Sequence, residues 1–203
     1  MSGSCKVPGL VEPKRLARDF FERDAREVAS ALVGVRLVHV LDGTRLEGVV
    51  VETEAYRGPE DRACHARFGR TKARENLFAA PGTAYVFLVY GMHLCFNVTC
   101  LREGAGHAVL LRAVATPLGR GDGPGRLARV MQICAAHGGE DLVASKRLFF
   151  EQPALRPKVG VSPRVGVGYA AEDADLPLRF FDLESRAVSR PARSNIGRGL
   201  PRP

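Results

Sequence analysis

Two glutamates separated by one residue, Glu52 and Glu54, are the side chains in this sequence best suited to acid–base chemistry. They lie in a mostly apolar run, residues 45–55, which predicts a β-strand. Successive side chains of a strand point to opposite faces, so both carboxylates should share one face while Thr53 and Ala55 share the other. A carboxylate held near a scissile bond can accept a proton from water and stabilise developing positive charge.

The location of the glutamates near the end of that strand favours a functional role. Tyr56-Arg57-Gly58-Pro59 is a turn sequence, so the strand should end beside the carboxylates. Binding and catalytic side chains are common at a sheet rim, where strands give way to loops. A simpler interpretation, with both glutamates on a solvated face, also fits the sequence alone.

A predicted β-hairpin supplies aromatic side chains. Strands expected at 83–90 and 94–99 meet at a tight reversal around Gly91, which places Tyr90 and Met92 at the tip. An aromatic ring exposed at a hairpin tip is unfavourable in water unless a partner covers it, and a nucleobase is a suitable cover. Packing of Tyr90 into the core is the alternative interpretation.

Positive charge predicts a polyanionic partner. The 203 residues carry a formal net charge of +8, and the pI is about 9.7. A basic cluster follows the glutamates, and we expect four of its members to contact phosphates: Arg67, Arg70, Lys72 and Arg74. Residues 185–203 contain five arginines and no acidic residue, which predicts a basic, disordered tail. That tail either tracks DNA or only aids solubility.

The remaining patterns predict one domain over residues 14–184, after a disordered N-terminus, 1–13. Helices are expected at 15–22, at 24–32 with caps at Asp24 and Gly34, and at 124–137. Strands are expected at 35–40, 107–114, 165–169 and 178–183. Asp42-Gly43 predicts a hairpin turn between the first two strands.

Four blocks of the sequence together resemble one known family. In order, VETEAYRGPEDRACH, PGTAYVFLVYGMHLCFN, VLLRAV and RVGVG resemble the alkyladenine (3-methyladenine) DNA glycosylase family. The resemblance extends from about Phe20 to Phe181, and the joint pattern is far more specific than any single glutamate or tyrosine. We therefore expect an α+β fold: a single domain with a curved, mainly antiparallel β-sheet flanked by helices and a protruding β-hairpin.

The resemblance implies a base-excision repair enzyme. Such an enzyme flips alkylated or deaminated purines (3-methyladenine, 7-methylguanine, hypoxanthine or etheno-adenine) out of double-stranded DNA and hydrolyses the N-glycosidic bond, leaving an abasic site. Glu54 corresponds to the general base that activates the attacking water, and Arg112 and the backbone carbonyl of Val165 to groups that hold this water. Glu52 is expected to be a supporting charge. No lysine is placed to attack the sugar, so we expect a monofunctional glycosylase.

The resemblance also implies how the base is held. Tyr56, His65 and Phe87 correspond to the pocket that sandwiches the flipped base, and Asn97 to the residue that disfavours the amino group of guanine. Family members commonly have tyrosine at the position of Phe87. The phenyl ring keeps the stacking face, and the missing hydroxyl can shift base preference.

At the hairpin tip, Tyr90 corresponds to the residue inserted into the minor groove, and Met92 lies at the same intercalating tip.

Composition limits the cellular setting. The five cysteines are odd in number and scattered, which predicts reduced thiols. No run approaches the roughly 20 apolar residues of a membrane helix. We expect a cytoplasmic monomer, associated with the nucleoid if the source is bacterial, with no metal or other cofactor and no membrane partner.

Two alternatives belong to other functional classes. The first is a noncatalytic nucleic-acid binding module whose aromatic rings stack on bases. The second is a metal-dependent nuclease that uses His65, His93, Glu52 and Glu54, although these histidines lack the close spacing of a zinc site.

Overall fold

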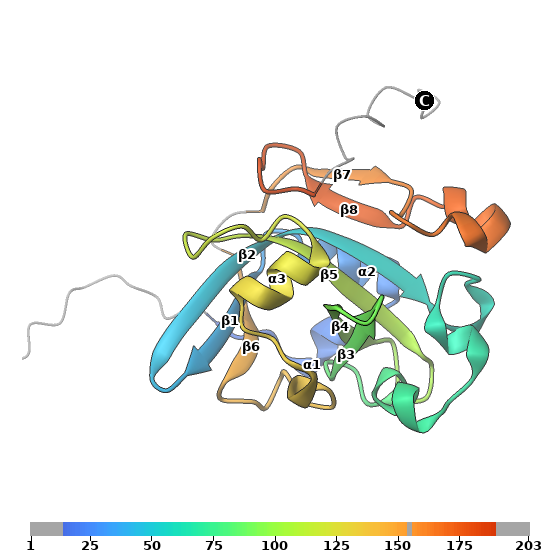
Figure 1. The fold of residues 1–203 in the computed structure, drawn as a ribbon, viewed down its shortest axis with the longest axis horizontal. Coiled ribbons are helices and arrows are strands. Elements are labelled where there is room, and N and C mark those ends of the chain that lie inside the picture. The colour runs from blue at the N-terminus through green and yellow to red at the C-terminus, as the bar shows by residue number, and fades with distance from the viewer. Residues whose placement is uncertain (1–13, 154–155, 190–203) are drawn as a thin grey trace, which may run out of the picture.

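The computed structural model describes residues 14–153 and 156–189 (Figure 1). The predicted disordered N-terminus, 1–13, and residues 190–203 of the predicted basic tail lie outside the described residues. Residues 185–189 are described, and Ser189 is buried.

One strongly curled antiparallel sheet dominates the described residues (Figure 1). Its strands are β1 Arg36–Leu41, β2 Thr44–Arg57, β3 Ala84–Val89, β4 His93–Cys100, β5 His107–Ala115, β6 Leu148–Glu151, β7 Val159–Ser162 and β8 Arg179–Asp182. The strand order is β3-β4-β5-β2-β1-β6, and β8 pairs with both β2 and β7. The predicted α+β class and the curved antiparallel sheet are confirmed.

Three short α-helices accompany the sheet in the described part of the chain: α1 Arg18–Phe21, α2 Ala25–Leu32 and α3 Pro124–Val130. The predicted caps of α2 are confirmed, since the Asp24 carboxylate accepts the Arg26 backbone N–H at 2.9 Å and Gly34 has a φ of 92°. The helix predicted over 15–22 is reduced to α1. The prediction of a helix to residue 137 is wrong, because Gln132 has a left-handed φ of 52°.

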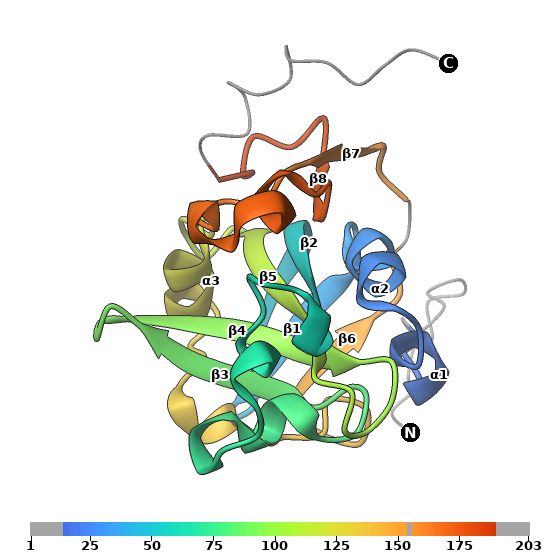
Figure 2. The same ribbon diagram turned by 90° about the vertical axis from the view of Figure 1, so that its right-hand side faces the viewer.

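Tight reversals join the hairpin strands as predicted. Asp42 and Gly43 have φ values of 47° and 77°, which fits the turn type that matches the twist of a β-hairpin. In the second hairpin, Val89 pairs with His93, so three residues form the tip. Figure 2 shows this β3–β4 hairpin projecting beyond the rest of the molecule. The predicted protruding hairpin is therefore confirmed.

The late part of the chain departs from the prediction. The strand expected at 165–169 is wrong: the Val165 N–H bonds the Glu54 side chain at 2.7 Å, and Gly166 has a φ of 77°. A 3₁₀ helix, Gly168–Asp175, follows. β8 confirms the strand predicted at 178–183, whereas β6 and β7, four residues each, were not predicted.

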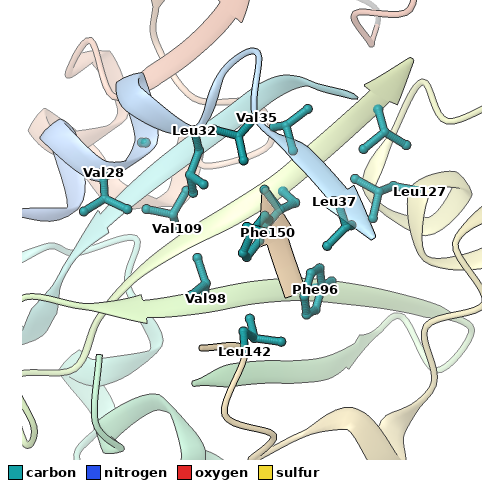
Figure 3. Packing of buried hydrophobic residues seen from close by; sticks show 14 of the residues in the cluster. Val28, Leu32, Val35, Leu37, Phe96, Val98, Val109, Leu127, Leu142 and Phe150 are labelled. Atoms are coloured by element: carbon teal, nitrogen blue, oxygen red, sulfur yellow. The ribbon is translucent and has the colours of Figure 1, made fainter. Parts of the chain in front are cut away.

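A large hydrophobic core fills the curl of the sheet. Figure 3 shows Val28 and Leu32 of α2 close to Val109 of β5 and Phe150 of β6, and these residues are at most 1% exposed. Burial of each such side chain contributes about 1.5–3 kcal/mol. Ala55 also belongs to this core, as alternation along β2 predicts. The core therefore fixes β2 from one face and leaves its other face for polar side chains.

Candidate active site

The centre of β2 is irregular, and this irregularity shapes the site. Glu52 pairs with Ala113 of β5 while the next residue, Thr53, pairs with Leu111, so Arg112 has no direct partner across the ladder. Such a bulge redirects a side chain and strengthens the local twist. On its other edge, β2 pairs first with β1 and then, at Glu52–Glu54, with β8. The two glutamates thus lie where the pairing partner of β2 on this edge changes from β1 to β8.

Glu54 is completely buried, so the solvated-face interpretation is wrong. Its Oε2 accepts a hydrogen bond from the Tyr56 hydroxyl at 3.0 Å and lies 3.4 Å from Nη1 of Arg112. Its Oε1 accepts the Val165 N–H at 2.7 Å. The carboxylate therefore contacts Tyr56, Arg112 and Val165. The Val165 contact is made by the backbone N–H, whereas the resemblance implied that the backbone carbonyl holds the water.

Glu52 is also completely buried and is bound more extensively. Its Oε1 accepts hydrogen bonds from Nε of Arg112 at 2.8 Å, Nε of Arg179 at 2.7 Å and the Ser189 hydroxyl at 2.9 Å. Its Oε2 accepts the Ser189 N–H at 2.7 Å. Burial by itself raises the pKa of the Glu52 carboxyl, but the charges of Arg112 and Arg179 and the Ser189 hydrogen bond outweigh it and lower this pKa.

A cavity of about 540 Å³ adjoins this network, a size typical of ligand pockets. Its lining includes the predicted site residues Tyr56, His65, Phe87, Tyr90, Asn97, Arg112 and Val165, together with Tyr85, Cys95 and Tyr169. Glu54 does not line the cavity itself; it lies one hydrogen bond behind the wall, bound to Tyr56, Arg112 and Val165. A larger cavity of about 800 Å³, beside α2, is lined by none of the predicted site residues.

Aromatic rings form one wall of the cavity. The centroid of Phe87 lies 4.5 Å from that of His65 and 5.2 Å from that of Tyr85. Nδ1 of His65 lies 3.0 Å from the Tyr85 hydroxyl. Burial, assisted by the charge of Arg74, lowers the pKa of His65, so this imidazole is neutral at physiological pH. Burial raises the pKa of Tyr85 to about 12, so its hydroxyl keeps its proton.

Tyr56 is held from behind by a buried ion pair. The Arg164 guanidinium lies 4.8 Å from the centre of the Tyr56 ring and bonds the Asp61 carboxylate at 2.5 and 2.8 Å. Arg164 also donates to the Ala55 carbonyl at 3.0 Å. Burial and the charge of Glu54 hold the pKa of Tyr56 well above its usual value, so it remains a hydrogen-bond donor. The Arg164–Asp61 ion pair therefore joins Tyr56, on the cavity wall, to the segment that begins at Val165.

Asn97 lines the cavity and is 3% exposed. Its Nδ2 donates to the backbone carbonyl of Tyr85 at 3.0 Å, which fixes the amide. Tyr85 was not among the predicted site residues, although it lies two residues before Phe87 and so shares its strand face. Tyr169 was missed as well, because the strand predicted there does not form.

The hairpin tip and the basic cluster present their side chains to solvent. Tyr90 is 87% exposed and Met92 is 70% exposed, so the alternative in which Tyr90 packs into the core is wrong. Tyr90 also has a φ of 52°, which bulky residues rarely adopt. The basic cluster, Arg67, Arg70, Lys72 and Arg74, lies between β2 and β3, on two 3₁₀ helices, His65–Phe68 and Lys72–Phe78, and on the loop that joins them. Its members are exposed except Arg74, which is half-buried.

The four residues of the nuclease alternative are separately engaged. Glu52 and Glu54 bind arginines, His65 contacts Tyr85, and His93 is exposed beside the hairpin tip. Within residues 14–153 and 156–189, no three His, Cys, Asp or Glu side chains are grouped as metal ligands would be. Nor does any helix in those ranges have the length and apolarity needed to span a bilayer.

Comparison with known proteins identifies the family. The family model of methylpurine-DNA glycosylase matches residues 19–186. A protein of Anaeromyxobacter dehalogenans (strain 2CP-C), named "Putative 3-methyladenine DNA glycosylase", is 46% identical over 183 residues, covering 88% of each chain. One of the same name from Desulfitobacterium hafniense (strain Y51) is 41% identical over 201 residues, covering 87% of this chain and 98% of the relative.

The chain therefore belongs to the methylpurine-DNA glycosylase family. It is a DNA N-glycosylase, a hydrolase that acts on DNA. The predicted family and enzyme class are confirmed, and the noncatalytic binding module is set aside.

Proposed function

We propose that this enzyme releases alkylated or deaminated purines, 3-methyladenine among them, from double-stranded DNA. It does so by hydrolysis and leaves an abasic site. The observation that carries the proposal is a buried carboxylate, Glu54, held directly behind an aromatic-walled cavity by groups that line it. The names of the relatives support 3-methyladenine as a substrate.

In the binding step, the damaged nucleotide leaves the duplex and enters the cavity. Extrusion costs a few kcal/mol and costs less when damage weakens pairing. Stacking on Tyr56, His65 and Phe87 offsets this by about 1–3 kcal/mol per base. Ring faces attract positive charge, so the pocket favours cationic alkylated purines. Asn97, fixed by Tyr85, excludes the amino group of guanine.

In the chemical step, a water molecule attacks the anomeric carbon while Glu54 accepts its proton. The glycosidic bond breaks, and its electron pair leaves with the purine. For the water to reach the carboxylate, it takes the place of one present hydrogen-bond donor, either the Val165 N–H or the Tyr56 hydroxyl. Among the described residues that line the cavity none is a lysine, which supports a monofunctional reaction.

Duplexes that each contain one defined lesion test the proposal. After incubation with the enzyme, alkali cleaves the strand at any abasic site. We expect release of 3-methyladenine, 7-methylguanine, hypoxanthine or etheno-adenine, equally in the presence of a chelator, and no strand cleavage before alkali. Failure to release every one of these bases would contradict the proposal, and loss of activity in chelator would favour a metal-dependent reaction.

Tyr90→Ala should impair action on duplexes. Tyr90 is the exposed ring best placed to fill the space that the extruded base leaves, and a stacked ring is worth about 1–3 kcal/mol. We expect the single-turnover rate at limiting enzyme to fall about tenfold or more, while thermal stability is unchanged. Leu118→Ala, which removes another exposed apolar side chain, is the matched control. Equal rates for the two variants would exclude an insertion role for Tyr90.

The salt dependence of duplex binding should show whether the basic cluster contacts phosphates. Each phosphate contact contributes about −0.9 to the slope of log K against log salt concentration. We expect Arg70→Ala or Lys72→Ala to make the slope shallower by about that amount. Lys146→Ala removes an exposed charge in the turn before β6 and should leave the slope unchanged. An unaltered slope for Arg70→Ala and Lys72→Ala would mean that these two residues do not contact phosphates.

A further inference from the structure

Arg112 is bound more closely to Glu52 than to Glu54. Its Nε donates to Glu52 at 2.8 Å and its Nη2 to the Ser189 hydroxyl at 3.3 Å, whereas Nη1 lies 3.4 Å from Glu54. Arg112 is only 7% exposed, so these neighbours determine the position of its guanidinium. Two of its three nitrogens therefore bind Glu52 and Ser189, and only Nη1 lies near the proposed base.

Glu52 is fixed by parts of the chain distant in sequence. Arg179 of β8 donates to the same oxygen as Arg112, and Ser189 binds both oxygens of the carboxylate. The network contains two carboxylates, Glu52 and Glu54, and two guanidiniums, so its formal charges balance. Since Glu52 contacts neither the cavity nor Glu54 directly, any influence on the reaction must pass through Arg112 or act through its charge.

We propose that Glu52 is a positioning residue that keeps Arg112 from pairing more closely with Glu54, so that Glu54 remains a competent proton acceptor, and that Ser189 supports this arrangement. The inference rests on the proposed function of Glu54 as the general base.

Competition between Glu52 and Glu54 for the guanidinium of Arg112 explains how Glu52 influences Glu54. Without the Glu52 charge, Arg112 gains by turning toward Glu54, and a carboxylate paired more tightly with a cation accepts a proton less readily. Loss of the neighbouring negative charge of Glu52 also makes Glu54 accept a proton less readily. The other groups that face Glu54 are Tyr56 on β2, Cys95 on β4 and Arg164 and Val165 before the 3₁₀ helix, and none of these is altered.

Glu52→Gln tests the inference, with Glu151→Gln as its control. Glu151 is also buried and paired with arginines, at the β6 edge of the sheet. We expect the acid limb of the single-turnover pH–rate profile to move down by about one pH unit in Glu52→Gln, with a roughly tenfold lower plateau. Glu151→Gln should keep the parental profile. An unchanged acid limb in Glu52→Gln would overturn the inference, since a merely structural role would not move it.

The side chain of Glu54 gives a readout that does not need activity. Carbon-13 NMR follows protonation of its carboxylate, assigned with Glu54→Gln, and its midpoint should fall by the same amount, about one pH unit, in Glu52→Gln. No base release by the parental enzyme would contradict the proposed function. An unmoved carboxylate midpoint in Glu52→Gln would contradict this inference, whether or not base is released.

Ser189→Ala provides a milder second variant if Glu52→Gln fails to fold. It removes the hydroxyl contacts to Arg112 and Glu52 and keeps the backbone hydrogen bond to Glu52. A smaller downward shift of the acid limb and of the carboxylate midpoint is expected. If both stayed at the parental pH, the inference would be rejected.

Discussion

Glu54→Gln should reduce the single-turnover rate of base release by about 10²–10⁴-fold, the usual contribution of general acid–base catalysis. Glutamine retains an oxygen that can accept the Val165 N–H but cannot accept a proton from water. Binding to lesion-containing duplexes should change little, because Glu54 lies behind the cavity wall and does not line it. Rapid-quench assays and binding titrations on the same duplex measure the two effects separately.

Glu47→Gln is the control for that variant. Glu47 lies on the same strand, β2, and pairs with Arg36 and Arg45 at the surface. Its replacement should leave the rate within about twofold, since exposed ion pairs contribute less than about 1 kcal/mol. A Glu54→Gln enzyme that released base at the parental rate would show that another group activates the water.

Asp61→Ala should cause a large loss of stability. Arg164 and Asp61 are both buried and joined by two hydrogen bonds, and removal of one partner from a buried pair costs about 3–5 kcal/mol. The free energy of unfolding in urea measures this loss. Glu75→Ala breaks the exposed Arg70–Glu75 pair and should cost less than about 1 kcal/mol. Similar losses for both variants would mean that Arg164 finds another partner.

The contribution of Asp61 to the free energy of unfolding should also depend on pH. Burial raises the pKa of the Asp61 carboxyl, but hydrogen bonds and charge from Arg164 outweigh burial and lower this pKa below its usual value of 3.8. The unfolded chain therefore takes up a proton at higher pH than the folded one. The stabilisation is complete above the unfolded value and is lost as pH falls through the folded value. The difference between parent and Asp61→Ala should shrink in acid, and a constant difference would contradict this assignment.

Local patterns predicted the parts of the fold that short-range geometry determines. The Asp24 cap, the Asp42-Gly43 turn and the β3–β4 hairpin all follow from residues within a few positions of each other. The strand with Glu52 and Glu54 was also recognisable, because an apolar run that ends in a turn sequence is typical of a β-strand. The resemblance to a family then supplied the distant partners Arg112 and Val165.

Long-range side-chain contacts were beyond a single sequence. Glu52 meets Arg179 and Ser189 across 127 and 137 residues, and Arg164 meets Asp61 across 103. Nothing in the local sequence predicts such pairs, since the distance between the two side chains in space depends on how the sheet curls. The failure at 165–169 has the same origin: the Val165 N–H bonds a side chain of β2 rather than a neighbouring strand.

The attachment of β7 and β8 to the sheet has a consequence for native-state fluctuations. β7 pairs only with β8 within the described residues, and β8 joins the rest of the sheet along Glu52–Glu54 of β2. Secondary elements with so few external pairings tend to open together as one cooperative unit. Detachment of this unit would carry Arg179 away from Glu52 and Phe180 out of the hydrophobic core, while the other strands stayed paired. Amide hydrogen exchange in β7 and β8 would then report the fraction of molecules that are folded yet unable to hydrolyse.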